Sequence, residues 1–293
     1  MGEFLRALAD PDIAFLRYAF LAGLLASVAF GVIGTYVVVR RISYIAGAIS
    51  HCVLGGIGAA LYLQKARGLE WCDPMLGAVV SALLSAIVIG LVSMYASQRE
   101  DTVIGSLWAT GMAVGLLFLA RTPGYIDPMS YLFGSILLIS KTDLFVVAGL
   151  DAAVVATGVF FYNKFLALCF DEEFTRLRGV RVGFYYMLLL CLTALTVVLL
   201  VRVVGIVMVI ALLTLPSAVA GQFARRLWHM MLLSIFFCAV FNIAGLAISY
   251  IHELPSGPTI IVLAAATYLA VLAGSRIPNL LRGRGRKSRA IAK

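Results

Sequence analysis

The sequence predicts an all-α protein, a polytopic bundle of about nine membrane-spanning helices. Of its 293 residues, 62% are hydrophobic and only 13% are charged, whereas soluble domains contain roughly 45–50% apolar and about 25% charged residues. A soluble fold of this length needs more polar surface than the chain supplies, but a fold surrounded by lipid does not. Apolar stretches recur along the whole chain, and each is long enough for a helix to cross a bilayer, which takes about 20 residues.

Nine such stretches are present, and eight spans are the alternative count. The predicted spans cover about residues 14–39, 43–64, 75–96, 102–120, 143–162, 184–201, 204–222, 230–250 and 258–275. Residues 121–142 contain two prolines and are only moderately apolar, which predicts an outer loop with a short helix. Residues 163–183 form the longest inner polar segment. We therefore expect residues 1–275 to form one transmembrane domain, with no room for a soluble catalytic domain.

The lysines and arginines predict an amino terminus outside and a carboxyl terminus inside. With this orientation the inner segments hold 16 and the outer segments 7 of the 23 lysines and arginines, as the positive-inside rule requires. Much of the net charge of +9 lies in a basic cytoplasmic tail, residues 276–293. Directly after an apolar span, such a tail indicates contact with anionic membrane lipid rather than with nucleic acid.

Ionisable residues inside a bilayer are costly, so they mark candidate functional sites. His51 lies early in the second span beside Ser50 and Cys52, and imidazole is a ligand for zinc and a workable one for manganese and iron. A histidine hydrogen-bonded to a neighbouring helix is the structural alternative. Asp151 lies midway along the fifth span, either in an ion pathway or as a buried acid paired with a neighbouring hydroxyl, and we favour the second interpretation.

The outer face offers one further candidate pair. His252 and Glu253 directly precede the sequence LPSGP, close to the predicted end of the eighth span. A histidine and a carboxylate can bind metal, but adjacent residues diverge in direction. At the outer mouth the pair either binds the ion or faces solvent or a partner protein.

The inner face holds a candidate coupling segment, at about residues 216–228. Pro216 is expected to break or kink the seventh span, and it is followed by Ser217, small residues and the basic pair Arg225 and Arg226. A short helix on the membrane surface that docks into a cytoplasmic partner fits this pattern, and a plain kinked helix end is the alternative. The sequence contains no G-x-x-x-x-G-K-[ST] phosphate loop, so any ATP must bind to another subunit.

Three regions resemble the metal-ion permeases of ATP-binding-cassette importers, the zinc, manganese and iron uptake group. The regions are GVIGTYVVVRRISYIAGAISHCVLGGIG (31–58), GVRVGFYYMLLLCLTALTVVLLVRVVGIVMVIALLTLPSAVAGQFARRL (179–227) and SYIHELPSGPTIIVL (249–263). The resemblance implies a non-enzymatic permease of the bacterial inner membrane that carries divalent zinc, manganese or iron and has no permanently bound cofactor. It also implies a second permease subunit, identical or paralogous, cytoplasmic ATP-binding subunits and an extracytoplasmic metal-binding protein.

The resemblance maps the family's histidine onto His51 and its coupling helix onto the segment from Pro216 to Trp228. One departure affects the ion site, because the family's acidic residue four positions before that histidine is Gly47 here. The missing carboxylate either comes from a different permease subunit, is replaced by Cys52 or a hydroxyl, or leaves a weakly binding pathway. The alternative functions are a permease for a metal chelate or siderophore and an ATP-independent metal carrier or channel.

Overall fold

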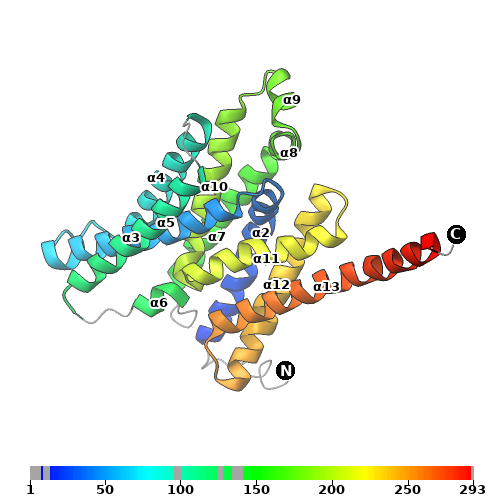
Figure 1. Ribbon diagram of the computed structural model, residues 1–293. Helices are drawn as coiled ribbons and strands as arrows, with labels where there is room; N and C mark the ends of the chain where they lie inside the picture. The colour runs from blue at the N-terminus through cyan, green and yellow to red at the C-terminus, as the bar shows by residue number, and fades with distance from the viewer. Residues whose placement is uncertain (1–7, 9–13, 96–99, 125–127, 134–140, 292–293) are drawn as a thin grey trace.

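The computed structural model describes residue 8 and residues 14–95, 100–124, 128–133 and 141–291 of the chain. These residues form helices and connecting turns, with no strand among them (Figure 1). The helices are α2 (Ala14–Val39), α3 (Ser43–Arg67), α4 (Pro74–Tyr95), α5 (Glu100–Arg121), α6 (Pro128–Phe133), α7 (Lys141–Phe160), α8 (Tyr162–Phe170), α9 (Glu172–Leu177), α10 (Val182–Val204), α11 (Ile206–Phe223), α12 (Leu227–His252) and α13 (Ser256–Ile291).

The predicted membrane bundle is confirmed. Within the described part of the chain, 8 helices are long and apolar enough to cross a membrane, namely α2, α3, α4, α5, α10, α11, α12 and α13. The count is up to 9 if α7 and α8 form one broken span, because these two helices meet at a bend of 65°. The predicted short helix between the fourth and fifth spans is α6.

The fifth predicted span, residues 143–162, agrees with α7 to within two residues at each end, and a bend that the sequence did not predict follows it. Helix α7 ends at Phe160, and α8 begins at Tyr162 after the bend. A helix end leaves its last carbonyl groups without partners inside the helix. The Tyr36 hydroxyl of α2 donates to one of them, the Gly158 carbonyl, at 3.0 Å. The neighbouring helix therefore satisfies the interrupted backbone, as a break at membrane depth requires.

The bundle is organised around two tightly packed groups of helices. Helix α3 lies between α4 and α5, and α2 packs against α7, α11 and α12; α10 joins the two groups, and α13 covers α11 and α12 (Figure 1). Glycines permit the close approaches. A Cβ atom on Gly56 of α3 would lie 2.1 Å from the Gly77 carbonyl oxygen of α4, and one on Gly58 would lie 2.6 Å from the Gly115 carbonyl oxygen of α5.

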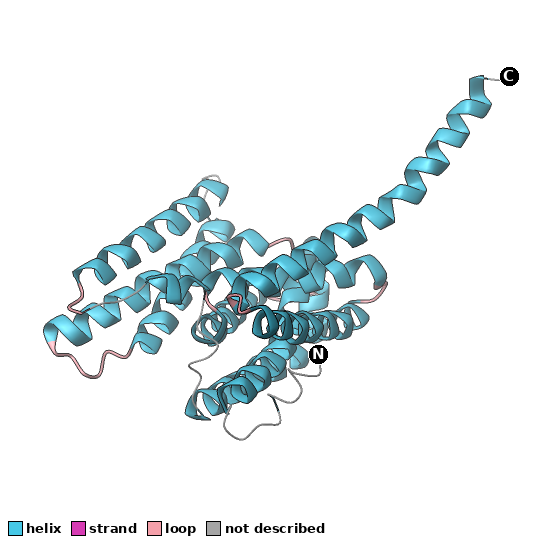
Figure 2. Ribbon diagram, turned by 90° about the horizontal axis from the view of Figure 1, so that it is seen from below, coloured by secondary structure: helices cyan, strands magenta, loops and turns pink. Residues whose placement is uncertain are grey.

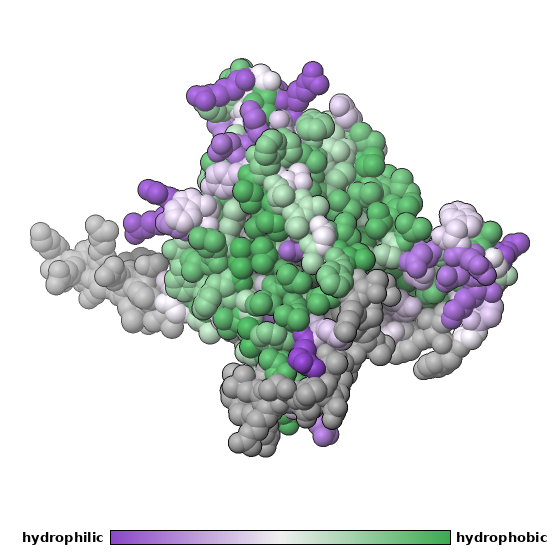
Figure 3. All heavy atoms as spheres, turned by 180° about the vertical axis from the view of Figure 1, so that it is seen from behind, coloured by the Kyte–Doolittle hydropathy of each residue, from purple (hydrophilic) through white to green (hydrophobic). Residues whose placement is uncertain are grey.

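Two cavities lie at opposite ends of the bundle. The larger cavity measures about 580 Å³ and is lined by Arg40, Tyr95 and Glu172, at the ends of α2 and α4 and the start of α9. A smaller cavity of about 160 Å³ joins Asp73 before α4, Tyr131 of α6 and Val201 near the end of α10. Helix α4 therefore runs from the smaller cavity to the larger one. Figure 3 shows a broad apolar surface with polar residues gathered toward its margins, as expected of a protein that crosses a bilayer.

Helix α13 continues beyond the predicted span of residues 258–275 and reaches Ile291. At 1.5 Å per residue its 36 residues extend about 54 Å, well beyond the roughly 30 Å of a bilayer's hydrocarbon core. Its last part stands away from the bundle as an isolated arm (Figure 2). The basic tail of residues 276–293 is therefore helical as far as Ile291.

At Pro216 the sequence predicts a break or a kink, and the structure shows no break. Helix α11 runs without interruption from Ile206 to Phe223, with Pro216 inside it, so residues 216–223 are its last two turns rather than a separate short helix. Proline removes one backbone hydrogen bond and normally disrupts a helix interior. Here Pro216 is buried, and the contacts of α11 with α2, α12 and α13 hold the helix together, as neighbouring helices do in membrane proteins.

Candidate metal pathway around His51

His51 lies inside the bundle, on the part of α3 that faces α5. Its side chain is 9% exposed, and the imidazole stacks on the indole of Trp108 from α5, with ring centroids 4.7 Å apart and an angle of 23° between the planes. Tyr44 contacts the same indole at a centroid distance of 5.5 Å. The histidine is thus held by aromatic contacts with a neighbouring helix.

The Nδ1 atom of His51 is buried and has no hydrogen-bond partner among the residues that the structure describes. An unpaired buried polar atom costs roughly 1–3 kcal/mol, and a histidine kept only for structure normally has its ring nitrogens hydrogen-bonded. Among the described residues, Nδ1 therefore makes no hydrogen bond to a neighbouring helix. A nitrogen that is buried and free suits a group that binds its ligand only for part of a transport cycle.

The space beside Gly47 is filled by the same indole. A Cβ atom on Gly47 would lie 2.9 Å from Cζ3 and 3.1 Å from Cη2 of Trp108, so no side chain fits there while the indole keeps its place. Sequence reasoning did not single out Trp108. Its spacing to Gly111 and Gly115 was the available signal, because positions three and four apart share a helix face.

The two neighbours of His51 point their polar atoms elsewhere. The Ser50 hydroxyl donates to the Ala46 carbonyl of its own helix at 2.8 Å, and the Cys52 thiol donates to the Leu107 carbonyl of α5 at 3.2 Å. Within the described residues, no three histidine, cysteine or acidic side chains are grouped so as to hold a metal ion. A complete metal site is therefore not formed by the described part of this chain.

Asp151 faces a different helix from His51. It is 7% exposed and accepts a hydrogen bond from the backbone N–H of Ala29, in α2, at 3.2 Å. The expected partner was a hydroxyl, and the observed one is a backbone amide. Asp151 and His51 are thus oriented toward α2 and α5 respectively.

His252 and Glu253 lie at the exposed end of α12. His252 is the last residue of the helix, and Glu253 follows in a left-handed conformation with φ 53°. Both side chains are exposed. Their placement fits the surface position that the sequence predicts, and the described chain brings no third metal-binding group to them.

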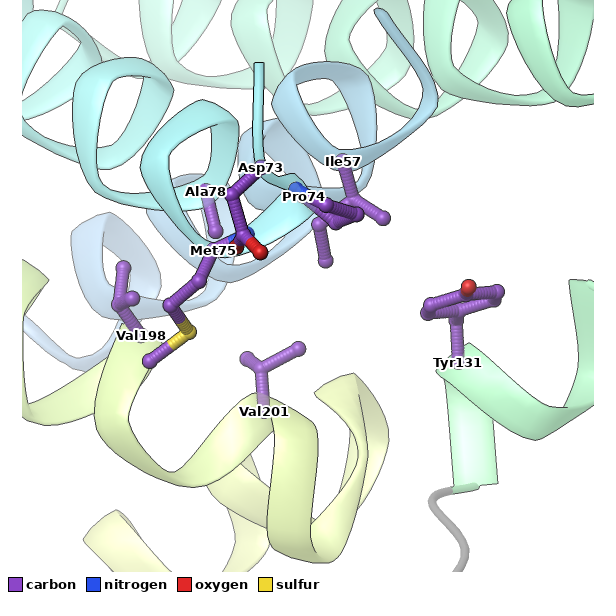
Figure 4. A pocket seen from close by; sticks show the side chains of 8 residues that line it. All are labelled: Ile57, Asp73, Pro74, Met75, Ala78, Tyr131, Val198 and Val201. Atoms are coloured by element: carbon purple, nitrogen blue, oxygen red, sulfur yellow. The ribbon is translucent and has the colours of Figure 1, made fainter. Parts of the chain in front are cut away.

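The smaller cavity lies at the same end as the α3–α4 turn and was not predicted. Figure 4 shows the Asp73 carboxylate and the Met75 thioether on one wall, with the Tyr131 ring across the cavity. The Asp73 carboxylate also accepts the Met75 backbone N–H at 2.7 Å, which caps the start of α4. Tyr131 lies within the predicted outer loop, residues 121–142, so part of that loop lines this cavity.

The opposite end carries the candidate coupling residues. Arg225 and Arg226 are exposed in the short connection between α11 and α12. Eight residues before Arg225, the Ser217 hydroxyl is hydrogen-bonded to the Ser234 hydroxyl of α12 at 2.7 Å, and both are fully buried. Helices α11 and α12 are therefore joined by a buried hydrogen bond about two turns from the exposed arginines.

Charged side chains contact one another beside the larger cavity. The guanidinium group of Arg40, at the end of α2, donates to the carboxylate of Glu172 at the start of α9, and Arg176 lies 3.6 Å from the same carboxylate. Arg40 also lies over the Tyr186 ring of α10, 5.7 Å from its centroid. These contacts connect three separate helices at this end of the bundle.

Comparison with known proteins gives concordant matches over nearly the whole chain. Residues 12–275 match the ABC 3 transport family. A "probable metal transport system membrane protein" of Chlamydia pneumoniae is 41% identical, over 86% of each chain. The manganese transport system membrane protein MntC of Halalkalibacterium halodurans is 31% identical, over 87% of this chain and 85% of that protein. The solved structure of PsaBC from Streptococcus pneumoniae superposes with a TM-score of 0.81 at 31% identity, over 92% of this chain and 94% of that chain.

Proposed function

Because the chain belongs to the ABC 3 transport family and is a multi-pass permease subunit of a bacterial metal importer, we propose that manganese is the divalent ion it carries. The name of the Halalkalibacterium relative supports this choice of metal. The family assignment favours import of the free ion over transport of a metal chelate and over an ATP-independent carrier. The bacterial inner membrane is its location.

His51 is the residue proposed to contact the ion within the membrane. The observation that carries this role is the buried Nδ1 atom without a hydrogen-bond partner, on a side chain that is 9% exposed. A single imidazole binds manganese weakly, because this metal prefers oxygen ligands. Weak binding agrees with passage, since an ion held tightly does not leave a transport pathway quickly.

A second permease subunit is proposed to complete the ion site. This chain has glycine at position 47 where the family it resembles has a carboxylate, and its described residues form no full metal-binding group. A paralogous partner that keeps the carboxylate would supply the oxygen ligand that manganese favours. An identical partner would supply a second His51 instead.

ATP is proposed to act on separate cytoplasmic subunits. The chain lacks a phosphate-binding loop, while Arg225 and Arg226 are exposed between α11 and α12 and are the proposed contact with those subunits, together with Pro216 and Ser217 behind them. The proposed outer mouth, where a metal-binding protein delivers the ion, includes His252 and Glu253.

The proposed topology places the amino terminus outside and residues 276–293 at the cytoplasmic surface, where their basic side chains face anionic lipid. Residues 1–275 are the permease domain in this arrangement.

Manganese uptake by the reconstituted complex tests the proposal. His51→Phe removes both ring nitrogens but keeps a ring that can stack on Trp108, so the complex should assemble normally while uptake of ⁵⁴Mn falls sharply. Assembly is measured by co-purification of the ATP-binding subunits. Wild-type uptake by the phenylalanine variant would remove His51 from the pathway, and uptake without ATP would exclude the importer mechanism.

A further inference from the structure

We infer that Trp108 is the positioning residue of the ion pathway, and that its indole fixes the plane of the His51 imidazole in place of a hydrogen bond. The inference deepens the proposed function and rests on it, because it assigns a role to Trp108 only if His51 contacts the ion. Neither the family match nor the relatives assign a role to this tryptophan. Three observations support it, and each concerns the contact between α3 and α5.

The first observation is the geometry of the stack. The imidazole and indole planes are 23° apart, with centroids separated by 4.7 Å, so the indole covers one face of the imidazole. The lone pair with which the unprotonated ring nitrogen binds a metal lies in the plane of the ring and not on its face. Stacking therefore restricts rotation of the imidazole while leaving its nitrogens free for an ion.

The second observation is that Nδ1 of His51 has no hydrogen-bond partner. A histidine that binds metal is usually oriented by a hydrogen bond from its other nitrogen to a carboxylate, a backbone carbonyl or water. Nδ1 is the nitrogen proposed to contact the ion, and the described residues show no hydrogen bond to it. The interaction that they do show orienting the ring is therefore the stacked contact. Trp108 makes the stacked contact, and Tyr44 supports the indole at 5.5 Å.

The third observation is that the indole of Trp108 occupies the space that a side chain at position 47 would need. A Cβ atom at position 47 would lie 2.9 Å from the indole, a distance that forces one of the two groups to move. Helix α5 approaches α3 this closely because Gly111 and Gly115 lie on the same face as Trp108; a Cβ on Gly111 would be 2.8 Å from the Cys52 backbone. The stacked indole of Trp108 and a carboxylate side chain at position 47 therefore cannot both occupy the space beside His51.

The arrangement changes the chemistry that the ion meets. With glycine at position 47, this chain offers an imidazole held between aromatic and small residues, and it offers no carboxylate from the same helix face. Nitrogen ligands favour zinc over manganese more strongly than oxygen ligands do. Zinc should therefore compete well with manganese for this chain's contribution to the site.

Fluorescence provides a test that does not depend on transport. The chain has three tryptophans, so Trp71→Phe and Trp228→Phe leave Trp108 as the sole tryptophan of the permease; the tryptophans of its partner subunits are replaced by phenylalanine in the same way. Mn²⁺ is paramagnetic and quenches fluorescence at short range. Added to the purified complex, Mn²⁺ should give saturable quenching, and the further substitution His51→Phe should abolish it. Quenching that persists unchanged in the His51→Phe variant would overturn the inference.

Transport kinetics separate positioning from packing. Trp108→Leu fills the space but cannot stack, so KM for manganese should rise roughly 10–100-fold, as for other residues that orient a metal ligand. Trp108→Phe keeps a stacking ring and should restore KM to within a few-fold of wild type. An unchanged KM in the leucine variant would overturn the inference, whereas the proposed function would survive as long as His51→Phe still abolishes uptake.

The pair Gly47→Asp and Trp108→Leu provides the final test. Gly47→Asp alone should impair uptake, because the new side chain displaces the indole from His51. Combined with Trp108→Leu, the carboxylate gains space, and the double variant should transport manganese better than Gly47→Asp alone. Strictly additive losses would contradict the mutual exclusion of the indole and the carboxylate. Each comparison requires equal yields of assembled complex, measured by co-purification of the partner subunits.

Discussion

Replacing Gly34 with alanine should destabilise the bundle at the contact between α2 and α11. A Cβ atom on Gly34 would lie 2.1 Å from the carbonyl oxygen of Leu213 and 2.8 Å from the hydroxyl oxygen of Ser217. The serine side chain can rotate, although it would then lose its hydrogen bond to Ser234. The carbonyl oxygen belongs to the backbone of α11, so it cannot move without the helix.

The magnitude follows from the size of this overlap. Ordinary contacts of a Cβ atom begin near 3.4 Å, so α2 and α11 must separate locally by about 1.3 Å, the difference from the 2.1 Å found at Leu213. Overpacking a well-packed core costs ~1–3 kcal/mol, and a clash with backbone belongs at the upper end of that range. Alanine recovers ~0.5–1 kcal/mol of helix propensity relative to glycine, which leaves a net loss of about 2 kcal/mol.

Thermal stability of the complex in detergent measures this effect. The fraction that remains monodisperse after heating gives an apparent melting temperature, which should fall for Gly34→Ala. Gly149→Ala is the matched control, because Gly149 lies in helix α7 and its Cβ atom would have nothing within 4 Å. The control should be unchanged or slightly more stable. Equal melting temperatures for the two variants would refute the inference that α2 and α11 are in backbone contact at Gly34.

Three further sets of substitutions test other parts of the structure. Ser217→Ala should destabilise the complex by roughly 1–3 kcal/mol in thermal denaturation, because it leaves the Ser234 hydroxyl buried and unpaired. The double variant with Ser234→Ala should lose less stability than the two single variants combined. Simple additivity of the two losses would argue against the hydrogen bond. Changing Arg225 and Arg226 together to glutamate should reduce co-purification of the ATP-binding subunits and uncouple ATP hydrolysis from uptake, whereas normal yield and coupling would place the contact elsewhere. Asp151→Asn retains an oxygen that can accept the α2 backbone N–H and should preserve manganese uptake, while Asp151→Leu should lower the melting temperature; loss of uptake in the asparagine variant would instead assign the carboxylate to the ion pathway.

Much of the fold could be predicted from composition and spacing. Predicted spans at residues 14–39 and 43–64 agree closely with α2 and α3, because an apolar run of membrane length has few stable alternatives to a helix. The structure differs from these expectations at Pro216, where the helix does not break, and after the fifth span, where a bend that the sequence did not predict leads into α8. Whether a proline breaks a helix depends on the neighbours that pack around it, and whether a span bends depends on partners such as the Tyr36 hydroxyl. Neither set of contacts is visible in a local stretch of sequence.

The candidate site was predicted less completely than the fold. His51 stands out in the sequence because an ionisable residue in an apolar span is rare and costly. The absence of a carboxylate at Gly47 is equally visible. Trp108 is separated from His51 by 57 positions, and nothing in either segment alone shows that the two rings meet.

The sequence by itself determined that this chain spans a membrane, which residues cross it and which few polar groups the bilayer must accommodate, because these properties depend on hydrophobicity summed along local stretches. Only the tertiary structure decided what surrounds each polar group. The stack of Trp108 on His51, the free Nδ1 atom and the indole that fills the space beside Gly47 all arise where α5 lies against α3. Contacts between helices depend on which faces meet and how closely the backbones approach, and those are properties of the packed bundle rather than of any one segment.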